Sequence, residues 1–73
     1  MQERRSEIIG DRRVQLVAQL DDYYAVIIEV RGPAGWEDIS LRADRYLAFD
    51  VASRRYRQRV AEQEARALAW GSY

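Results

Sequence analysis

The sequence predicts an α+β domain: a short antiparallel β-meander followed by one long C-terminal α-helix packed on one face of the sheet. First, apolar and polar residues alternate in two stretches within residues 13–42, a period of two that is typical of half-buried strands. Second, apolar residues recur every three or four positions from about residue 45 onward, which is typical of an amphipathic helix. Third, 73 residues without a linker or internal repeat favour one domain spanning residues 1–73.

Two structures are compatible with residues 1–12. The stretch RSEIIGDRR places two isoleucines before Gly10-Asp11, a pair of residues that is common in turns. A turn at this point makes the stretch a short fourth strand of the meander. Alternatively, the segment is an irregular arm whose Ile8 and Ile9 pack over one face of the sheet. The sequence does not choose between the two.

Three strands are expected in the remainder of the meander. Residues 13–20 alternate, with their apolar side chains on one face. Residues 23–30 read YYAVIIEV, which is apolar on both faces and rich in β-branched residues, so we expect the central strand there. The proline and glycines of RGPAG at 31–35 indicate a turn, after which residues 36–42 alternate again. The face that the helix covers should carry Leu16, Val26, Ile28, Ile39 and Leu41.

The register of the second hairpin follows from its apolar residues. Directly opposed residues lie on the same face of an antiparallel sheet, so apolar residues should oppose one another. This condition pairs Ile28 with Ile39 and extends the ladder to Val26 opposite Leu41. We therefore expect the third strand to continue through residue 42.

The first hairpin leaves two loop lengths to compare. A two-residue loop at Asp21-Asp22 mixes the two faces and lacks the glycine of a tight hairpin turn. A three-residue loop opposes Leu20 to Tyr24 and Leu16 to Ile28, which keeps the faces separate. We expect the longer loop.

Residues 45–69 are expected to form the helix. Asp44 directly before it is a typical N-cap residue, and Gly71 is a typical stop. Such a helix is about 37 Å long whereas an eight-residue strand spans only ~27 Å, so the C-terminal end of the helix should extend beyond the sheet. The apolar stripe expected to face the sheet consists of Phe49, Ala52, Tyr56, Val60 and Ala67.

Composition excludes several kinds of chemistry. The chain contains no cysteine, histidine or lysine, so disulfides, thiolate or histidine catalysis and Cys/His metal sites are unavailable to it. No glycine-rich phosphate loop is present, and no cofactor is expected. The N-terminal stretch is charged, and no apolar run approaches the ~18 residues that span a bilayer. We therefore expect a non-enzymatic cytoplasmic protein without a membrane segment.

The arginines of SRRYRQRV at 53–60 raise the question of nucleic-acid binding. The chain has twelve arginines against twelve acidic residues and a net charge of zero, which argues against a dedicated polyanion binder. Tyr56 and Val60 belong to the apolar stripe, so the arginines spread over the remaining faces of the helix, with acids at helical spacing nearby. We favour an ordinary solvated helix face. The alternative is a stripe that binds phosphate or an acidic protein, formed by Arg55, Arg59 and Arg66.

Apolar residues that the core does not use indicate surfaces for a partner. The sheet face opposite the helix carries an apolar and aromatic cluster beside Arg31 and Glu29, which is typical of a protein-binding surface. Alternatively, a small sheet leaves this area wet, or the N-terminal arm covers it. The predicted partner-binding residues are Val17, Tyr23, Ile27, Arg31 and Trp36 on this face, and Leu68 and Trp70 at the helix end.

These features favour a small, non-catalytic protein-binding module. In size and layout the chain resembles many small bacterial and phage-encoded proteins, which implies an inhibitor or adaptor of phage or mobile-element origin that acts by surface occlusion. The alternative is a small nucleic-acid-binding or regulatory protein that uses the helix arginines. We also expect a homodimer that covers exposed apolar surface, with the helix ends slightly favoured over the sheet faces as the contact.

Overall fold

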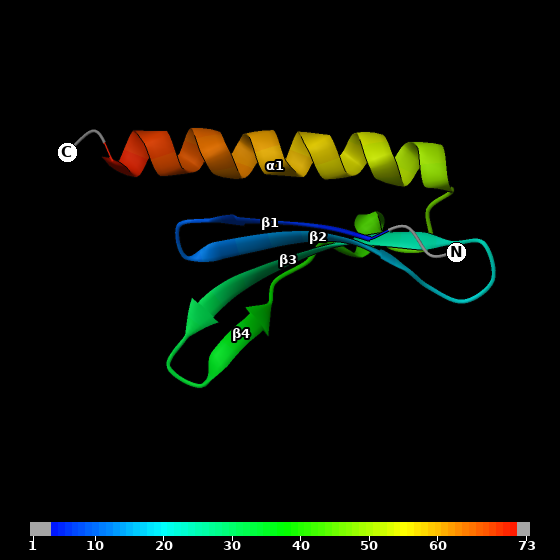
Figure 1. The fold of residues 1–73 in the computed structure, drawn as a ribbon, viewed down its shortest axis with the longest axis horizontal. Coiled ribbons are helices and arrows are strands. Elements are labelled where there is room, and N and C mark those ends of the chain that lie inside the picture. Colours follow the sequence, from blue (N-terminus) through cyan, green and yellow to red (C-terminus); the bar gives the residue numbers. More distant parts are fainter. Residues whose placement is uncertain (1–3, 72–73) are drawn as a thin grey trace.

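The computed structural model of the protein describes residues 4–71, apart from the side chain of Trp70. The four strands form one antiparallel meander in chain order, and the long helix lies across one face of the sheet (Figure 1). The predicted α+β class, with a meander followed by one long C-terminal helix, is confirmed. The elements are β1 (Arg5–Ile9), β2 (Arg12–Ala18), β3 (Tyr24–Gly32), β4 (Gly35–Asp38), the 3-10 helix η1 (Arg42–Asp44) and α1 (Phe49–Gly71).

The N-terminal segment forms a fourth strand, which decides between the two structures considered for residues 1–12. Ile9 opposes Arg12 across the turn at Gly10-Asp11, and Gly10 adopts a φ of 60°. Glycine reaches this left-handed conformation without the steric cost that a Cβ brings. In its described part the segment therefore extends the sheet at one edge and does not lie over a face, while residues 1–3 are outside the described chain.

The register of β2 against β3 differs from the expected one by two residues. The structure pairs Ala18 with Tyr24 and Leu16 with Val26, whereas the alternating pattern predicted Leu16 opposite Ile28. A shift of two residues keeps every side chain on its face, because the side chains of a strand alternate with a period of two. The assignment of faces was therefore right, and the predicted pairs were wrong.

The loop between β2 and β3 explains this shift. The N–H of Gln19 donates to the carbonyl of Tyr23 at 2.7 Å, so these two residues close the hairpin. Each of them comes one residue earlier in the sequence than the expected closing residues, Leu20 and Tyr24. Asp21 adopts a φ of 59°, a conformation that aspartate tolerates better than most residues. Leu20 consequently lies in the loop with 78% of its surface exposed, although the alternating pattern placed it in the strand.

The register of β3 against β4 is the expected one, but β4 is shorter than expected. The N–H of Ile39 still donates to the carbonyl of Ile28 at 2.8 Å. The N–H of Ile28, however, donates to the side-chain hydroxyl of Ser40 at 2.9 Å. This side-chain bond replaces the next backbone bond of the ladder, so the predicted pair Val26 and Leu41 does not form. Ile39 and Leu41 are exposed, and their expected place in the covered face was wrong.

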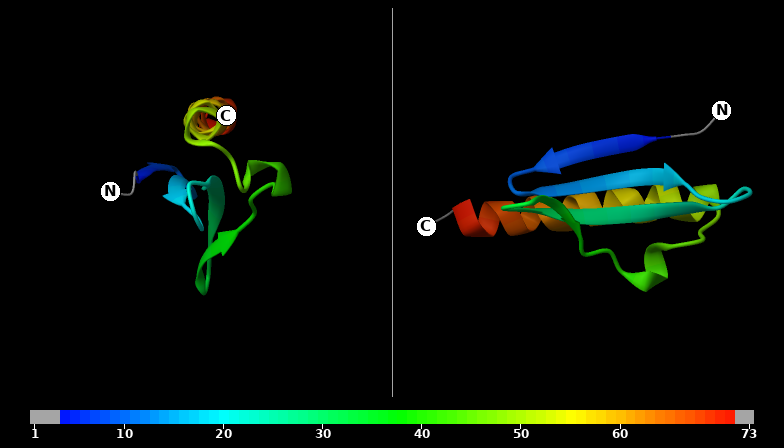
Figure 2. Two further views of the ribbon diagram at one scale, coloured as in Figure 1. Left: turned by 90° about the vertical axis from the view of Figure 1, so that its right-hand side faces the viewer. Right: turned by 90° about the horizontal axis from the view of Figure 1, so that it is seen from below.

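The chain then returns to β3 before the helix begins. Leu47 and Tyr24 exchange two backbone hydrogen bonds of 2.8 Å and form an isolated antiparallel bridge. This extended stretch occupies positions that were expected to be helical, so α1 begins at Phe49 and not at residue 45. Asp44 lies at the end of η1 and is not the N-cap of α1. Figure 2 shows this return path beside the sheet, with β4 turned away from α1.

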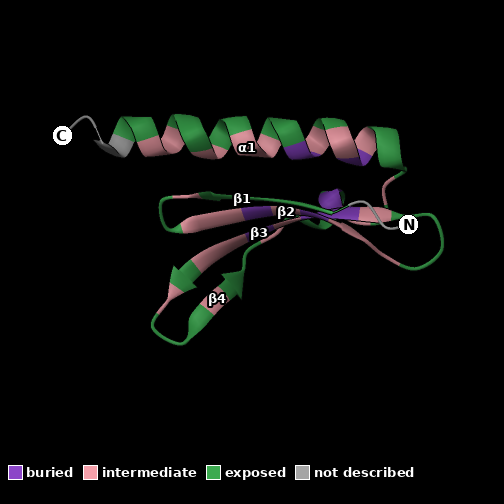
Figure 3. Ribbon diagram, viewed as in Figure 1, coloured by how far each residue is buried: buried purple, intermediate pink, exposed green. Residues whose placement is uncertain are grey.

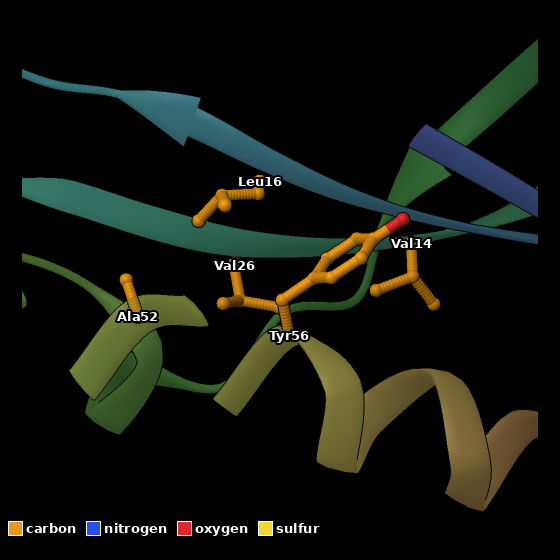
Figure 4. Packing of buried hydrophobic residues seen from close by; sticks show 5 residues of the cluster. All are labelled: Val14, Leu16, Val26, Ala52 and Tyr56. Carbon is orange, nitrogen blue, oxygen red and sulfur yellow. The ribbon is translucent and has the colours of Figure 1, made fainter. Parts of the chain in front are cut away.

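The core lies between α1 and the facing side of β2 and β3. Figure 4 shows Tyr56 reaching from α1 toward the valines of the sheet, and Figure 3 shows that the buried residues of the helix lie on its sheet-facing side. The predicted stripe is confirmed at Ala52 and Tyr56, while Phe49 remains 41% exposed and packs edge-to-face on Tyr24. The buried apolar cluster consists of Val14, Leu16, Val26, Ala52 and Tyr56.

We predict that Leu16→Ala lowers the free energy of unfolding by about 2–5 kcal/mol, because it removes a fully buried side chain and leaves a cavity. The matched control is Leu20→Ala, which makes the same change at a loop position and should cost less than ~0.5 kcal/mol. Urea unfolding of the two variants measures the difference. Equal costs would contradict the placement of Leu20 outside the core.

Candidate functional site

The sheet face that α1 does not cover, here called the outer face, is the candidate site. Side chains alternate along a strand, so the residues between the buried Val14, Leu16 and Val26 point to this face. The outer face combines charged, aromatic and apolar side chains from all four strands. Its main residues are Ile8, Arg13, Gln15, Val17, Ala25, Ile27, Glu29, Arg31 and Trp36.

Trp36 lies between two arginines on the outer face. The guanidinium carbon of Arg13 is 4.6 Å from the centroid of the Trp36 ring, and that of Arg31 is 5.2 Å away. Arg31 is directly opposite Trp36 in the β3–β4 ladder, whereas Arg13 reaches over from β2. Both distances are within the ~6 Å at which a cation is attracted to an aromatic ring. We call these three residues the Trp36 cluster.

Glu29 fixes one side of the Trp36 cluster. Its carboxylate oxygen Oε1 accepts hydrogen bonds from Nε of Arg13 at 2.8 Å and from Nε2 of Gln15 at 2.6 Å. Arg13 and Glu29 are opposed in the β2–β3 ladder, so backbone pairing brings the two charges together. The guanidinium of Arg13 is therefore held both by a carboxylate and by the indole ring.

The apolar part of the outer face lies toward the β2–β3 loop. Val17 and Ile27 are half-buried, and Tyr23 is exposed at the end of the face. The ring of Tyr23 packs edge-on against Tyr46, with 6.3 Å between centroids. Ala25 is fully buried, so it supports the face but offers no surface to a partner.

The structure thus brings together four of the predicted partner-binding residues, Val17, Ile27, Arg31 and Trp36, on one face. Arg13 was not among the predicted site residues, although the alternating pattern placed its side chain on the face opposite to that of Val14. The signal that could have identified Arg13 is its pairing. Arg13 on β2 is directly opposed to Glu29 on the neighbouring strand β3, and Trp36 lies on the next strand, β4. Leu68 is 74% exposed near the helix end, and the side chain of Trp70 lies outside the described residues, so the contact predicted there stays a prediction.

A second polar cluster lies at the opposite side of the sheet, around Asp44. This carboxylate is completely buried between η1 and α1. Its Oδ2 accepts from Nε of Arg59 at 2.9 Å, and its Oδ1 accepts from Nη2 of Arg59 at 3.2 Å and from Nη1 of Arg55 at 2.6 Å. We call these three residues the Asp44 cluster.

The charges of the Asp44 cluster stabilise one another. Burial by itself raises the pKa of the Asp44 carboxyl, but hydrogen bonds and positive charges from Arg59 and Arg55 outweigh burial and lower the pKa below its usual value. The hydrogen bond to Asp44 in turn raises the pKa of Arg59, which also pairs with Glu62 at 3.0 Å. The carboxylate is therefore ionised in the folded protein at neutral pH.

The Asp44 cluster bears directly on the predicted polyanion-binding stripe. Arg55 and Arg59 both direct their guanidinium groups toward Asp44, and Arg59 also pairs with Glu62, so two carboxylates balance these two charges within the fold. Arg66 lies further along α1, with its Nη1 3.8 Å from a carboxylate oxygen of Asp11. The structure therefore supplies a structural role for two of the three arginines.

Other kinds of site have little support in the described part of the chain. Among residues 4–71, no group of three or more acidic side chains lies close enough together to hold a metal ion. No helix within the same residues combines the length and the apolar character that a membrane span requires. Comparisons of the chain with protein-family models, with curated proteins and with solved structures find no match.

We predict that Asp44→Asn lowers the free energy of unfolding by about 3 kcal/mol, because it leaves two arginines around a neutral group in a buried position. Asp50→Asn is the matched control. Asp50 is exposed and lies 3.9 Å from Arg54, so its loss should cost less than ~0.5 kcal/mol. Chemical denaturation at pH 7 measures both values, and similar costs for the two variants would contradict a stabilising role for the Asp44 cluster.

The lowered pKa of Asp44 also predicts how stability depends on pH. Since the folded pKa is below that of the unfolded chain, about 3.9, the stabilisation is present above pH 4 and is lost as pH falls through the folded pKa. The difference in stability between the native protein and Asp44→Asn should therefore shrink on going from pH 7 to pH 2. Thermal unfolding of both proteins across this range is the measurement, and a constant difference would contradict the prediction.

Proposed function

We propose that this chain is a non-catalytic protein-binding module that binds its partner with the outer face of the sheet. The observation that carries the proposal is the Trp36 cluster, a tryptophan held between two arginines on the face of the sheet that α1 does not cover. Tryptophan, arginine and tyrosine are the residues most enriched where binding energy is concentrated in protein interfaces. Trp36 and Arg31 are the residues expected to contribute most.

The surroundings of Trp36 support a preorganised contact. Arg13 is already held by Glu29 and by the indole ring, so binding immobilises little additional side-chain freedom. Val17 and Ile27 add apolar surface on the same face. A central aromatic anchor with apolar neighbours and charged residues beside it is the usual composition of a protein interface.

A sheet face that offers no catalytic group acts most simply by covering a surface of its target. We therefore extend the proposal to an inhibitor or an adaptor that works by occlusion, a mode that requires no catalytic group. The small size and the layout of one sheet and one helix support a phage or mobile-element origin for such a protein. The net charge of zero supports a protein partner over a polyanion.

The experiment is capture of the partner by the tagged chain from the source cell, in the presence of nuclease and at high salt. The captured protein is then purified and its affinity measured. We predict that Trp36→Ala weakens binding by roughly 30-fold, equivalent to about 2 kcal/mol, because it removes the anchor of the face. Arg57→Ala, on an exposed part of α1, is the control and should bind like the native chain.

Two results would overturn this proposal. One is a captured protein whose affinity is the same for the native chain and for Trp36→Ala, with the fold of the variant confirmed by circular dichroism. The other is capture that disappears with nuclease or falls steeply with salt, which would favour the nucleic-acid alternative.

A further inference from the structure

The outer edge of β1 is the most available sheet edge in the described chain. β1 is the first strand of the sheet, and no described strand pairs with its other side. Four of its five residues are exposed, and Ile8 is exposed by 63%. Edge strands present unpaired backbone N–H and C=O groups that can pair with a second chain. β1 contains no proline to prevent such pairing.

The opposite edge of the sheet is much less available. β4 has only four residues, and Pro33 lies in the turn before it. Its last residue, Asp38, is paired with Arg45 at 3.0 Å and also accepts from the N–H of Ser40. Leu47 occupies the other end of the same edge of β3. Short strands, nearby proline and charged cover all reduce edge pairing.

The backbone of β1 directs alternate residues to its free edge. The carbonyl of Asp11 accepts from the N–H of Arg31 on β3. Since successive residues of an antiparallel strand direct their N–H and C=O to opposite sides, Arg12 directs its groups toward β1, where its partner is Ile9. Ser6 is three positions from Ile9, so its N–H and C=O point to the free edge.

The charges of β1 select one register for pairing with a second copy. A two-fold axis perpendicular to the sheet places one residue of β1 opposite its own copy. An axis centred on Arg5 or on Glu7 opposes like charges. An axis centred on Ile8 forms no charge pair between residues of the two β1 strands. Centred on Ser6, it opposes Arg5 of each chain to Glu7 of the other, which makes two pairs of opposite charge.

We propose that the protein forms a homodimer in which the β1 strands of two copies pair antiparallel about a two-fold axis at Ser6. The two Ser6 residues exchange backbone hydrogen bonds, and Ile8 of each chain lies opposite Arg4 of the other. These are the residues whose backbone groups point to the free edge. The backbone permits this register, and the charges of β1 select it over its neighbours.

This dimer has a defined architecture. The two four-stranded sheets become one sheet of eight strands, and the axis leaves both helices on the same side. Both outer faces then lie on the other side, each with its own Trp36 cluster. The contact differs from the helix-end or face-to-face contact expected from the sequence, and it does not depend on what the outer face binds.

The first test is the mass of the native chain in solution. Sedimentation equilibrium at micromolar concentration should give about 17 kDa, twice the 8.6 kDa of one chain. Ser6→Pro should give a folded monomer, because it removes an N–H that points to the free edge while leaving the bonds between β1 and β2 intact. Circular dichroism confirms that the variant is folded.

The second test identifies the register of the two β1 strands by disulfide cross-linking. The chain contains no cysteine, so an introduced cysteine can react only with its copy in the other chain. Opposed residues of a hydrogen-bonded pair have Cα atoms ~5.5 Å apart, within the range of a disulfide. Ser6→Cys should therefore form a disulfide-linked dimer on mild oxidation. Ile8→Cys is the control: the two copies are four positions apart along the strand, about 14 Å, and should not cross-link at the same rate.

The third test reverses the charges. Glu7→Arg places an arginine opposite Arg5 of the other chain at two positions of the dimer. These two pairs of like charges should weaken the dimer by on the order of tenfold. Combining it with Arg5→Glu restores two opposite pairs in exchanged positions and should recover the affinity. This recovery distinguishes the register centred on Ser6 from a general loss of the edge strand.

Three outcomes would overturn the proposal. A monomer at several hundred micromolar would exclude the dimer. A dimer that persists in Ser6→Pro would place the contact elsewhere, and its loss on Leu68→Ala or Trp36→Ala would identify the helix end or the outer face. Equal cross-linking of Ser6→Cys and Ile8→Cys, or no recovery in the charge-exchange variant, would exclude this register. Apart from a loss of the dimer on Trp36→Ala, which would place the dimer contact on the outer face, none of these results bears on partner capture.

Discussion

The arrangement of the molecule depends on the buried carboxylate of Asp44. A charge removed from water is costly unless it is paired and hydrogen-bonded, and here both carboxylate oxygens accept from arginines of the helix. Arg55 and Arg59 are four residues apart, so they lie one turn apart on the same side of α1. Because Asp44 lies within the segment that joins the sheet to the helix, this contact fixes which side of α1 turns toward that segment and hence which stripe faces the core.

The same interaction separates the structural arginines from those available to a partner. Arg55 and Arg59 are used within the fold, on the side of the sheet that the helix covers. Arg13 and Arg31 lie on the outer face around Trp36. A sheet this small has one face to cover and one face left over, since a single helix covers only one side. The arginines on the covered side therefore stabilise the fold, and those on the outer face are available to a partner.

Much of the fold is determined by the sequence alone, because strand and helix periods are local properties of the backbone. Alternation assigned Leu16 and Val26 to the covered face, and this assignment survived a register error of two residues because parity was preserved. The three- and four-residue spacing likewise placed Ala52 and Tyr56 in the core. For the candidate site, alternation also placed Val17, Ile27 and Trp36 together on the other face.

Only the tertiary structure decided where α1 begins and what its arginines contact. By local criteria Asp44 is a good N-cap, but the residues that bind it are 11 and 15 positions further along the chain. The β2–β3 loop also involves a contact between residues far apart in the sequence. The side-chain oxygen of Gln19 accepts a hydrogen bond from the N–H of Tyr46, 27 positions away. The Trp36 cluster also joins three strands. Local patterns in the sequence reflect the geometry of the backbone. These contacts form because buried polar groups need hydrogen-bond partners, and in the folded chain the partners come from distant parts of the sequence.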